Sequence, residues 1–296
     1  MEGIMARIIS FGVNGVSGFP VQVEVFAING IPAMEIIGLP DTSVRESKDR
    51  VNAAIRNSGK ELIPRRITVN LAPADVKKEG PSFDLPIAVG VMITMGQISP
   101  NPKLNLSNTA FFGELSLDGY VQPINGALPM VISAKENGIS EVILPEKNAS
   151  EVSCIQGIRI LPVSHLRQVA DYCEGKAEIK PQEQISFESL KNEATIITDM
   201  AMIKGQKGAR RAIEVAAAGG HNMLMIGTPG SGKTMLARCI PGILPPMSFE
   251  ESLETTRIHS ICGKLPPGNG LMVIRPFCSP HHNASVASLI GGGPEA

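Results

Sequence analysis

The chain has 296 residues, enough for about two domains of ordinary size, and 43% of them are hydrophobic. Its 27 Lys and Arg nearly balance its 28 Asp and Glu, which excludes the dense positive charge of a monomeric DNA-binding domain. No apolar run reaches the roughly 20 residues that span a bilayer, and the N-terminus lacks a secretory signal pattern. We therefore expect a cytoplasmic protein without membrane contact.

The first half of the chain alternates between strand and helix patterns. Alternating hydrophobicity predicts short strands, which lie at Val21–Phe26, Met34–Ile37, Arg66–Leu71 and Glu141–Leu144. Ala110–Leu117 and Tyr120–Gln122 are expected to pair as a hairpin around Asp118-Gly119. Together these patterns predict one α/β domain over residues 1–173.

Three helices are predicted among these strands. Ser43 and Glu46 have the spacing of a capping box, and the helix that they open is expected to stop at Gly59. The other two helices are expected at Asp84–Met95, which is apolar enough to be buried, and at Leu128–Asn137. Strands and helices that alternate in this way favour an α/β fold.

The second half begins with a change in composition. Residues 174–198 are polar and lack strong periodicity, which is typical of a linker. A second domain is expected over 199–296, beginning with an Ala-rich helix at Gln206–Ala218 and a short buried strand at Asn222–Ile226.

A phosphate-binding motif follows that strand directly. Eight residues fit the pattern G-x-x-x-x-G-K-[ST], namely Gly227, Thr228, Pro229, Gly230, Ser231, Gly232, Lys233 and Thr234. Glycines let the backbone turn its N–H groups around an anion, and the helix that begins near Lys233 directs its positive dipole end at the phosphates. Lys233 would face the β- and γ-phosphates of ATP, and the Thr234 hydroxyl would bind Mg²⁺.

Further short motifs surround this loop in a fixed order: Gly205-Gln206, Ala216-Ala-Ala-Gly-Gly-His-Asn222, Ile240-Pro-Gly242, Ile258-His-Ser260, Arg275-Pro-Phe277 and Pro280-His-His282. With them the chain resembles the magnesium-chelatase-like AAA+ ATPases, and within that group the YifB/ComM competence-protein family. The resemblance implies a Lon-protease-like domain (ribosomal protein S5 domain 2-like) over residues 1–173, followed by a P-loop AAA+ domain. It also implies a hexameric ATP-driven ring that acts on DNA branch migration, with Asp199–Gln206 near the adenine.

One departure from the family pattern limits the expected chemistry. The chain ends at Gly291–Ala296, before the place where the family has its acidic Walker B strand. The sequence is therefore expected to be C-terminally truncated, as a fragment or as a truncated gene product, and the AAA+ domain to be incomplete. Without those carboxylates we expect ATP binding but no hydrolysis, and no catalytic residue is assigned.

The Lon-like domain raises the question of a peptidase. Gly80-Pro-Ser82 resembles the position of the nucleophilic serine in Lon-type proteases, which a lysine on a later helix activates. Here the corresponding turn reads Pro123-Ile-Asn-Gly126, and no Lys or Arg occurs from 104 to 134. Ser82 is instead expected to cap the helix that begins at Phe83–Asp84.

The cysteines and histidines give a weaker signal. The five cysteines (Cys154, Cys173, Cys239, Cys262 and Cys278) form no Cys-x-x-Cys pair, which favours reduced and mostly buried thiols. A zinc site from Cys262, Cys278, His281 and His282 is disfavoured because the paired spacing of a structural zinc motif is missing. Arg275, His281 and His282 are candidates for DNA contact on an inserted loop, and a packed hairpin is an equally good interpretation.

Four functions remain open from the sequence. The first is a YifB/ComM-type DNA motor, or a truncated remnant of one. The second is a metal-chelatase motor subunit, which residues 1–173 argue against. A Lon-like peptidase is disfavoured by the missing lysine, and a nucleotide-dependent assembly module without catalysis is the most conservative alternative.

Overall fold

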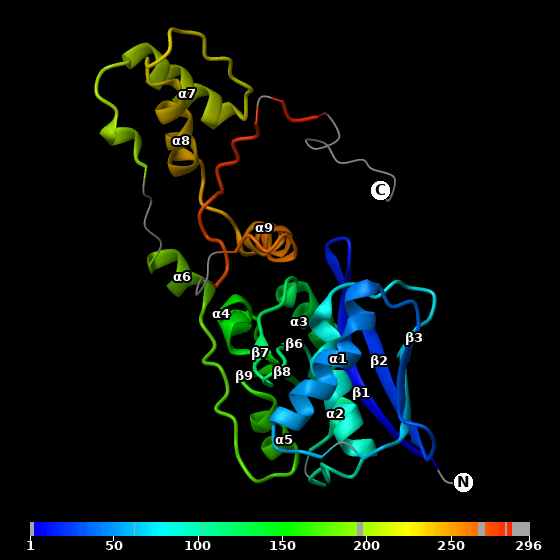
Figure 1. The fold of residues 1–296 in the computed structure, drawn as a ribbon. Coiled ribbons are helices and arrows are strands. Elements are labelled where there is room, and N and C mark those ends of the chain that lie inside the picture. Colours follow the sequence, from blue (N-terminus) through cyan, green and yellow to red (C-terminus); the bar gives the residue numbers. More distant parts are fainter. Residues whose placement is uncertain are drawn as a thin grey trace. The chain divides into compact units, whose positions relative to one another are not determined.

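The computed structural model describes residues 3–61, 63–102, 104–193, 198–265, 270–281 and 283–285. The chain forms two compact units: the first comprises Met1–Leu190 and Leu253–Leu271, and the second comprises Lys191–Ser252 and Met272–Ala296 (Figure 1). The sequence-based division into residues 1–173, 174–198 and 199–296 stays a prediction. No helix in the described ranges is long and apolar enough to cross a membrane.

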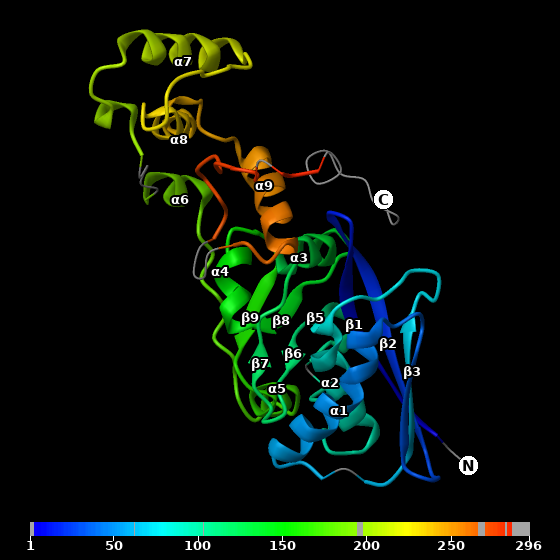
Figure 2. The same cartoon turned by 45° about the horizontal axis from the view of Figure 1, so that its top comes forward.

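A seven-stranded sheet organises the first unit. Its strands lie in the order β3-β4-β2-β1-β5-β8-β9, with bounds β1 Ile4–Asn14, β2 Ser17–Ile28, β3 Ala33–Ile37, β4 Arg66–Ala72, β5 Thr109–Phe111, β8 Glu141–Pro145 and β9 Arg159–Val163. β2 pairs antiparallel with β1 and β4, whereas the remaining pairs are parallel. Figure 2 shows β5, β8 and β9 beyond β1 on the side away from β2. The predicted α/β class is confirmed.

The predicted hairpin is confirmed in part. β6 (Glu114–Leu115) and β7 (Val121–Gln122) pair antiparallel around Asp118-Gly119. The prediction that the first strand starts at Ala110 is wrong, because Ala110 and Phe111 belong to β5 of the large sheet. Gly113 lies between β5 and β6, and its backbone bonds to the start of α2 and the turn before it. Its N–H donates to Ser82 O at 2.9 Å, and its carbonyl accepts from Leu85 N–H at 3.0 Å.

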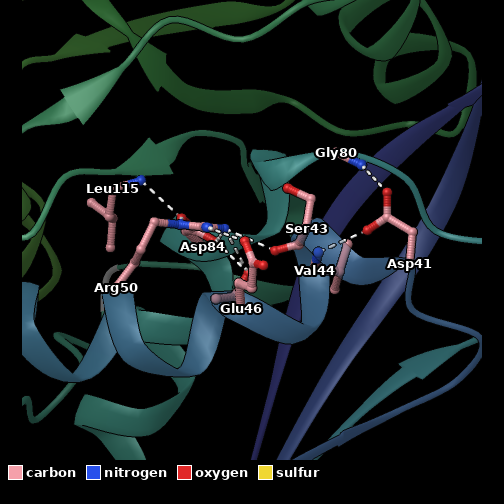
Figure 3. A network of polar contacts seen from close by, with 9 residues as sticks. Asp41, Ser43, Val44, Glu46, Arg50, Gly80, Asp84 and Leu115 are labelled. Atoms are coloured by element: carbon pink, nitrogen blue, oxygen red, sulfur yellow. Dashed lines mark hydrogen bonds and ion pairs between the residues drawn. The ribbon is translucent and has the colours of Figure 1, made fainter.

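Helix α1 (Thr42–Asn57) begins differently from the prediction. The N-cap is Asp41, whose carboxylate accepts from Val44 N–H at 2.7 Å and from Gly80 N–H at 3.1 Å (Figure 3). The predicted capping box at Ser43 and Glu46 is wrong, because Asp41 satisfies both the helix and a neighbouring loop. The predicted end is confirmed: Ser58 is the C-cap, and Gly59 follows with φ +81°.

The two helices nearest the sheet lie on its opposite faces. α2 (Asp84–Thr94) is buried and meets β1 and β2 at Gly90, where an added Cβ would lie 2.5 Å from a Val25 methyl carbon. α3 (Ala127–Glu136) approaches the other face at Gly18, where an added Cβ would lie 2.4 Å from Pro129 O. Side chains alternate between the faces of a strand, so even-numbered Gly18 and odd-numbered Val25 of β2 face opposite layers. The sheet is covered on both sides at β1 and β2.

A buried ion pair ties α1 and α2 together. Asp84 Oδ2 accepts from Arg50 Nε at 2.6 Å, and its Oδ1 accepts from Arg50 Nη2 at 3.0 Å and from the Ser47 hydroxyl (Figure 3). Leu115 N–H of β6 donates to Oδ2 at 3.1 Å. The Asp84 side chain is fully buried, so these donors replace the water that it loses on folding.

The first unit also contains shorter elements, most of them between or after the later strands. They are η1 Pro81–Phe83, η2 Leu106–Asn108, η3 Glu146–Asn148, α4 Ala149–Val152, α5 Leu166–Cys173 and the start of α6 (Phe187–Glu193). Three cysteines, Cys154, Cys173 and Cys239, are buried, which confirms the prediction of mostly buried free thiols. Burial raises the pKa of the Cys154 and Cys173 thiols to about 12, so both stay protonated at neutral pH.

The second unit is described by its helices. They are η4 (Met200–Met202), α7 (Lys207–Gly219), α8 (Lys233–Ile243) and the start of α9 (Phe249–Ile261). Two boundaries between the units fall inside helices, one in α6 between Leu190 and Lys191 and one in α9 between Ser252 and Leu253.

The predicted strand at Asn222–Ile226 is wrong. The segment does not form a strand, and Leu224 and Ile226 are 82% and 88% exposed. Met223 and Met225 pack instead on the cluster formed by α7 and α8, so the alternation of a strand is present. A strand also needs a hydrogen-bonded neighbour, and the described part of this unit offers none.

Candidate functional site

The candidate site is the loop that joins Ile226 to helix α8. Gly230 and Gly232 have φ +78° and +87°, a left-handed conformation that glycine adopts without a steric penalty. A Cβ added at either position would meet no atom within 4 Å, so open space lies beside the backbone there. Two glycines of the motif therefore shape the turn.

The Lys233 side chain lies across this loop. Its Nζ donates to the carbonyl oxygens of Gly227 at 2.8 Å and Thr228 at 2.7 Å, and to Ser231 Oγ at 3.2 Å. The ammonium group is thus held by oxygens of the same turn, at the first residue of α8. The positive charge of Lys233 therefore lies at the loop.

The beginning of α8 completes the anion-binding features. Gly232 is its N-cap and carries no side chain that could accept a hydrogen bond. The first N–H groups of a helix have no intrahelical partner, and together with the helix dipole they favour a negative ligand. Thr234 lies in this first turn and is exposed. In P-loop proteins the hydroxyl at this position of the motif binds Mg²⁺. These residues fit a phosphate group.

A small apolar cluster holds the loop in place. Met200, Ile203, Ile213, Leu236 and Cys239 are buried together, which joins η4, α7 and α8. Gln206 lies between η4 and α7 with φ +50°, and its Nε2 is 3.5 Å from Ser231 O of the loop. Gln206, the last residue of the segment that the family resemblance places near the adenine, is therefore next to the loop.

Ser82 of the Lon-like domain does not have its predicted role. Its side chain is 4% exposed, and Oγ has no hydrogen-bond partner among the described residues. The predicted cap is wrong because the turn η1 (Pro81–Phe83) precedes α2, so Ser82 lies inside a turn and Phe83 occupies the N-cap. A buried hydroxyl that lacks a base is not an activated nucleophile.

Lys78, four residues before Ser82, is the lysine nearest to it in sequence. It is fully buried, and its Nζ donates to Val76 O at 2.7 Å and to Pro73 O. Burial lowers the pKa of this ammonium group. Its hydrogen bonds to two carbonyls give Lys78 a structural role within its own loop.

The histidine and arginine candidates are separate features. Arg275 pairs with Glu251 at 2.9 Å and donates to Pro245 O at 2.9 Å, so its charge is already used inside the second unit. His281 Nδ1 accepts from Asn283 N–H at 3.3 Å, and His282 lies outside the described residues. Across the described ranges no three His, Cys, Asp or Glu side chains gather as possible metal ligands.

Helix α9 is not among the predicted helices, although the residues at its start carry a helix signal. Ser248 N–H donates to Glu251 Oε2 at 3.0 Å, and Glu251 N–H donates to Ser248 Oγ at 3.2 Å. This is a capping box in the spacing S-x-x-E. The backbone N–H of Ser248 and the Arg275 guanidinium lower the pKa of Glu251.

Family models match both halves of the chain. A model described as subunit ChlI of Mg-chelatase matches residues 23–148, and a model described as magnesium chelatase, subunit ChlI, matches residues 199–296. The second match includes the candidate loop.

Individual relatives extend this result. The uncharacterized protein YifB of Escherichia coli is 40% identical over 94% of this chain and 53% of its own length. Competence protein ComM of Haemophilus influenzae is 38% identical over 98% of this chain and 56% of its own length. Lon protease 2 of Bacillus subtilis is 31% identical over 57% of this chain and 32% of its own length. The chain thus spans about half the length of the YifB and ComM proteins that it matches, and it belongs to the magnesium-chelatase-like YifB/ComM family.

Proposed function

We propose that this protein binds the phosphates of ATP through Gly227–Thr234. The observation that supports the proposal most directly is the Lys233 ammonium group, held 2.7–3.2 Å from three loop oxygens at the uncapped start of α8. A phosphate oxygen would replace the carbonyls as the partner of Nζ and would accept hydrogen bonds from the loop N–H groups.

The metal ion and the adenine of the nucleotide are assigned to residues on either side of this contact. Thr234 would hold Mg²⁺ through its hydroxyl, and the metal would neutralise charge on the β- and γ-phosphates when bound. The family resemblance would place Asp199–Gln206 beside the adenine, and the 3.5 Å contact from Gln206 Nε2 to Ser231 O of the loop supports this.

In the whole protein, we propose that this module belongs to a ring of identical subunits, hexameric as in the family, that acts on DNA in the cytoplasm. The family supports an AAA+ role, and the relative named competence protein ComM supports a role in DNA branch migration during natural transformation. The alternative, a metal-chelatase motor subunit, is supported by the descriptions of the two family models, which both name a magnesium-chelatase subunit. We favour the DNA motor because YifB and ComM match nearly the whole chain, the Lon-like half included.

For the polypeptide 1–296 alone, we expect ATP binding without turnover. Hydrolysis needs Mg²⁺ held on two sides and a water oriented by an acidic group, and here Lys233 and Thr234 supply only part of this. The carboxylate of Glu251, an acidic residue after the loop, already accepts hydrogen bonds from Ser248 N–H and from Arg275.

Phosphate release from Mg²⁺-ATP, measured with and without branched DNA, tests this expectation. The predicted rate is that of buffer in both conditions. Turnover on the order of 1 s⁻¹, the low end of usual kcat values, would contradict it if the Lys233→Ala variant lost that turnover. Glu250 and Glu251 would then be the first acidic residues to substitute.

A further inference from the structure

Residues of α9 dock onto the Lon-like domain at the start of α3. Leu253–Leu271 belongs to the same compact unit as β1–β9. Within this unit, Gly126 N–H donates to Ser260 O at 3.1 Å, and the Ser260 hydroxyl donates to Glu151 Oε1. Ser260 thus holds the start of α3 with its carbonyl and α4 with its hydroxyl.

Glu151 is a buried carboxylate that depends on these donors. It is 7% exposed and also accepts from Leu128 N–H at 2.9 Å and from Asn148 Nδ2 at 3.1 Å. No Lys or Arg pairs with it in the part of the chain that the structure describes. Burial raises its pKa, and the three donors oppose that shift. Removing one donor from such a group is destabilising because water does not replace it freely.

The fit around this contact is close on both sides of the turn. Gly126 has φ +76°, and an added Cβ would lie 2.8 Å from a Val13 methyl carbon and 3.7 Å from Ile261 Cγ1. Gly263, just after α9, would bring an added Cβ within 2.9 Å of Asn125 Oδ1. Asn125 and Gly126 belong to the turn that the sequence analysis compared with the lysine-bearing turn of Lon-type proteases. In this chain the end of α9 covers that turn.

The docked residues are connected to the candidate loop through two helices. α8 begins at Lys233, and only residues 244–248 separate it from α9. The reciprocal bonds of Ser248 and Glu251 fix the start of α9, and its helical hydrogen bonds continue to Ile261. Ser260 and the candidate loop are therefore joined by a short stretch of chain that is mostly helical.

We propose that Glu151 and the start of α3 form a docking site for the end of α9, and that docking is coupled to nucleotide binding at Gly227–Thr234. This rests on the proposed function and adds its regulation. The docked chain is pre-organised for the nucleotide, so loss of docking weakens ATP binding. By linkage, ATP strengthens docking by the same factor.

The test uses the whole chain and the variant Ser260→Ala, which removes the hydroxyl from Glu151. Glu254→Gln is the matched control, because Glu254 lies on the same helix and is exposed. Deuterium uptake is followed for residues 253–263, with β1 and β2 as the measure of an intact fold, and ATP affinity is measured in parallel. Ser260→Thr keeps a hydroxyl and should restore both properties if the alanine variant folds poorly.

We expect Ser260→Ala to exchange at least about threefold faster over residues 253–263 and to bind ATP at least about fivefold more weakly, the lower end of usual coupling. ATP should slow exchange there in the parent and in Glu254→Gln. Faster exchange with unchanged ATP affinity would overturn the coupling and leave an ordinary packing contact. If the parent does not bind ATP, the proposed function itself fails and the coupling fails with it, whereas the exchange data still judge the docking.

Discussion

Replacing Lys233 by alanine is expected to abolish measurable ATP binding while leaving the fold intact. The side chain lies over the loop, where its Nζ contacts Gly227 O, Thr228 O and Ser231 Oγ, and none of these bonds joins another element of the unit. Its removal deletes the one full positive charge that the motif directs at the phosphates. Titration with a fluorescent ATP analogue measures the effect.

The matched control is Lys207→Ala at the start of α7, an exposed lysine that forms no ion pair with any residue that the structure describes. This variant should bind the analogue like the parent. Equal affinity of Lys233→Ala and the parent would refute the assignment of the loop. A fold lost in the Lys233 variant, seen by circular dichroism, would contradict the local role given to this side chain.

The largest effect on stability is expected from Asp84→Ala. The substitution removes the acceptor that Arg50, Ser47 and the Leu115 N–H share. The Asp84 side chain is fully buried, so water does not take its place freely. Breaking a buried ion pair by removing one partner costs about 3–5 kcal/mol. For a unit of this size that corresponds to a fall in Tm of roughly 6–20 °C.

Thermal unfolding followed by circular dichroism measures this loss. The control is Glu46→Ala, which removes another acid near Arg50. Glu46 lies 4.0 Å from Arg50 Nη1 and its side chain is 66% exposed, so the expected change is within about 1 kcal/mol. Similar melting of both variants would show that the buried network does not hold α1 to α2.

The sequence predicted the parts of this molecule that depend on neighbouring residues. The motif of the candidate loop is contiguous, so its glycines and Lys233 were identified directly. β3, β4 and β8 were found because their apolar pattern and the flanking turn residues coincide. β1 was missed because its run IMARIISFGVN mixes polar and apolar residues without clear alternation, and β9 because Pro162 interrupts it.

Contacts between residues that are far apart in the sequence could not be predicted from local sequence patterns. The hydroxyl of Ser260 meets Glu151 across 109 positions, and Arg50 meets Asp84 across 34. The burial of Ser82 likewise depends on how Gly113 crosses the start of α2. The segment Asn222–Ile226 shows the opposite error, because its alternation is genuine but a strand also needs a partner in space.

The most direct test of the central claim is calorimetric titration of the parent chain with ATP, ADP, AMP and adenosine in the presence of Mg²⁺. If the loop binds phosphates, affinity depends on the phosphate chain. ATP and ADP should bind in the micromolar to millimolar range, about −4 to −8 kcal/mol, and at least about tenfold more tightly than AMP, which corresponds to roughly 1.4 kcal/mol. Adenosine should give no measurable heat. Binding of adenosine as tight as that of ATP, or no binding of ATP at about 10 mM, beyond the weak end of that range, would contradict the account.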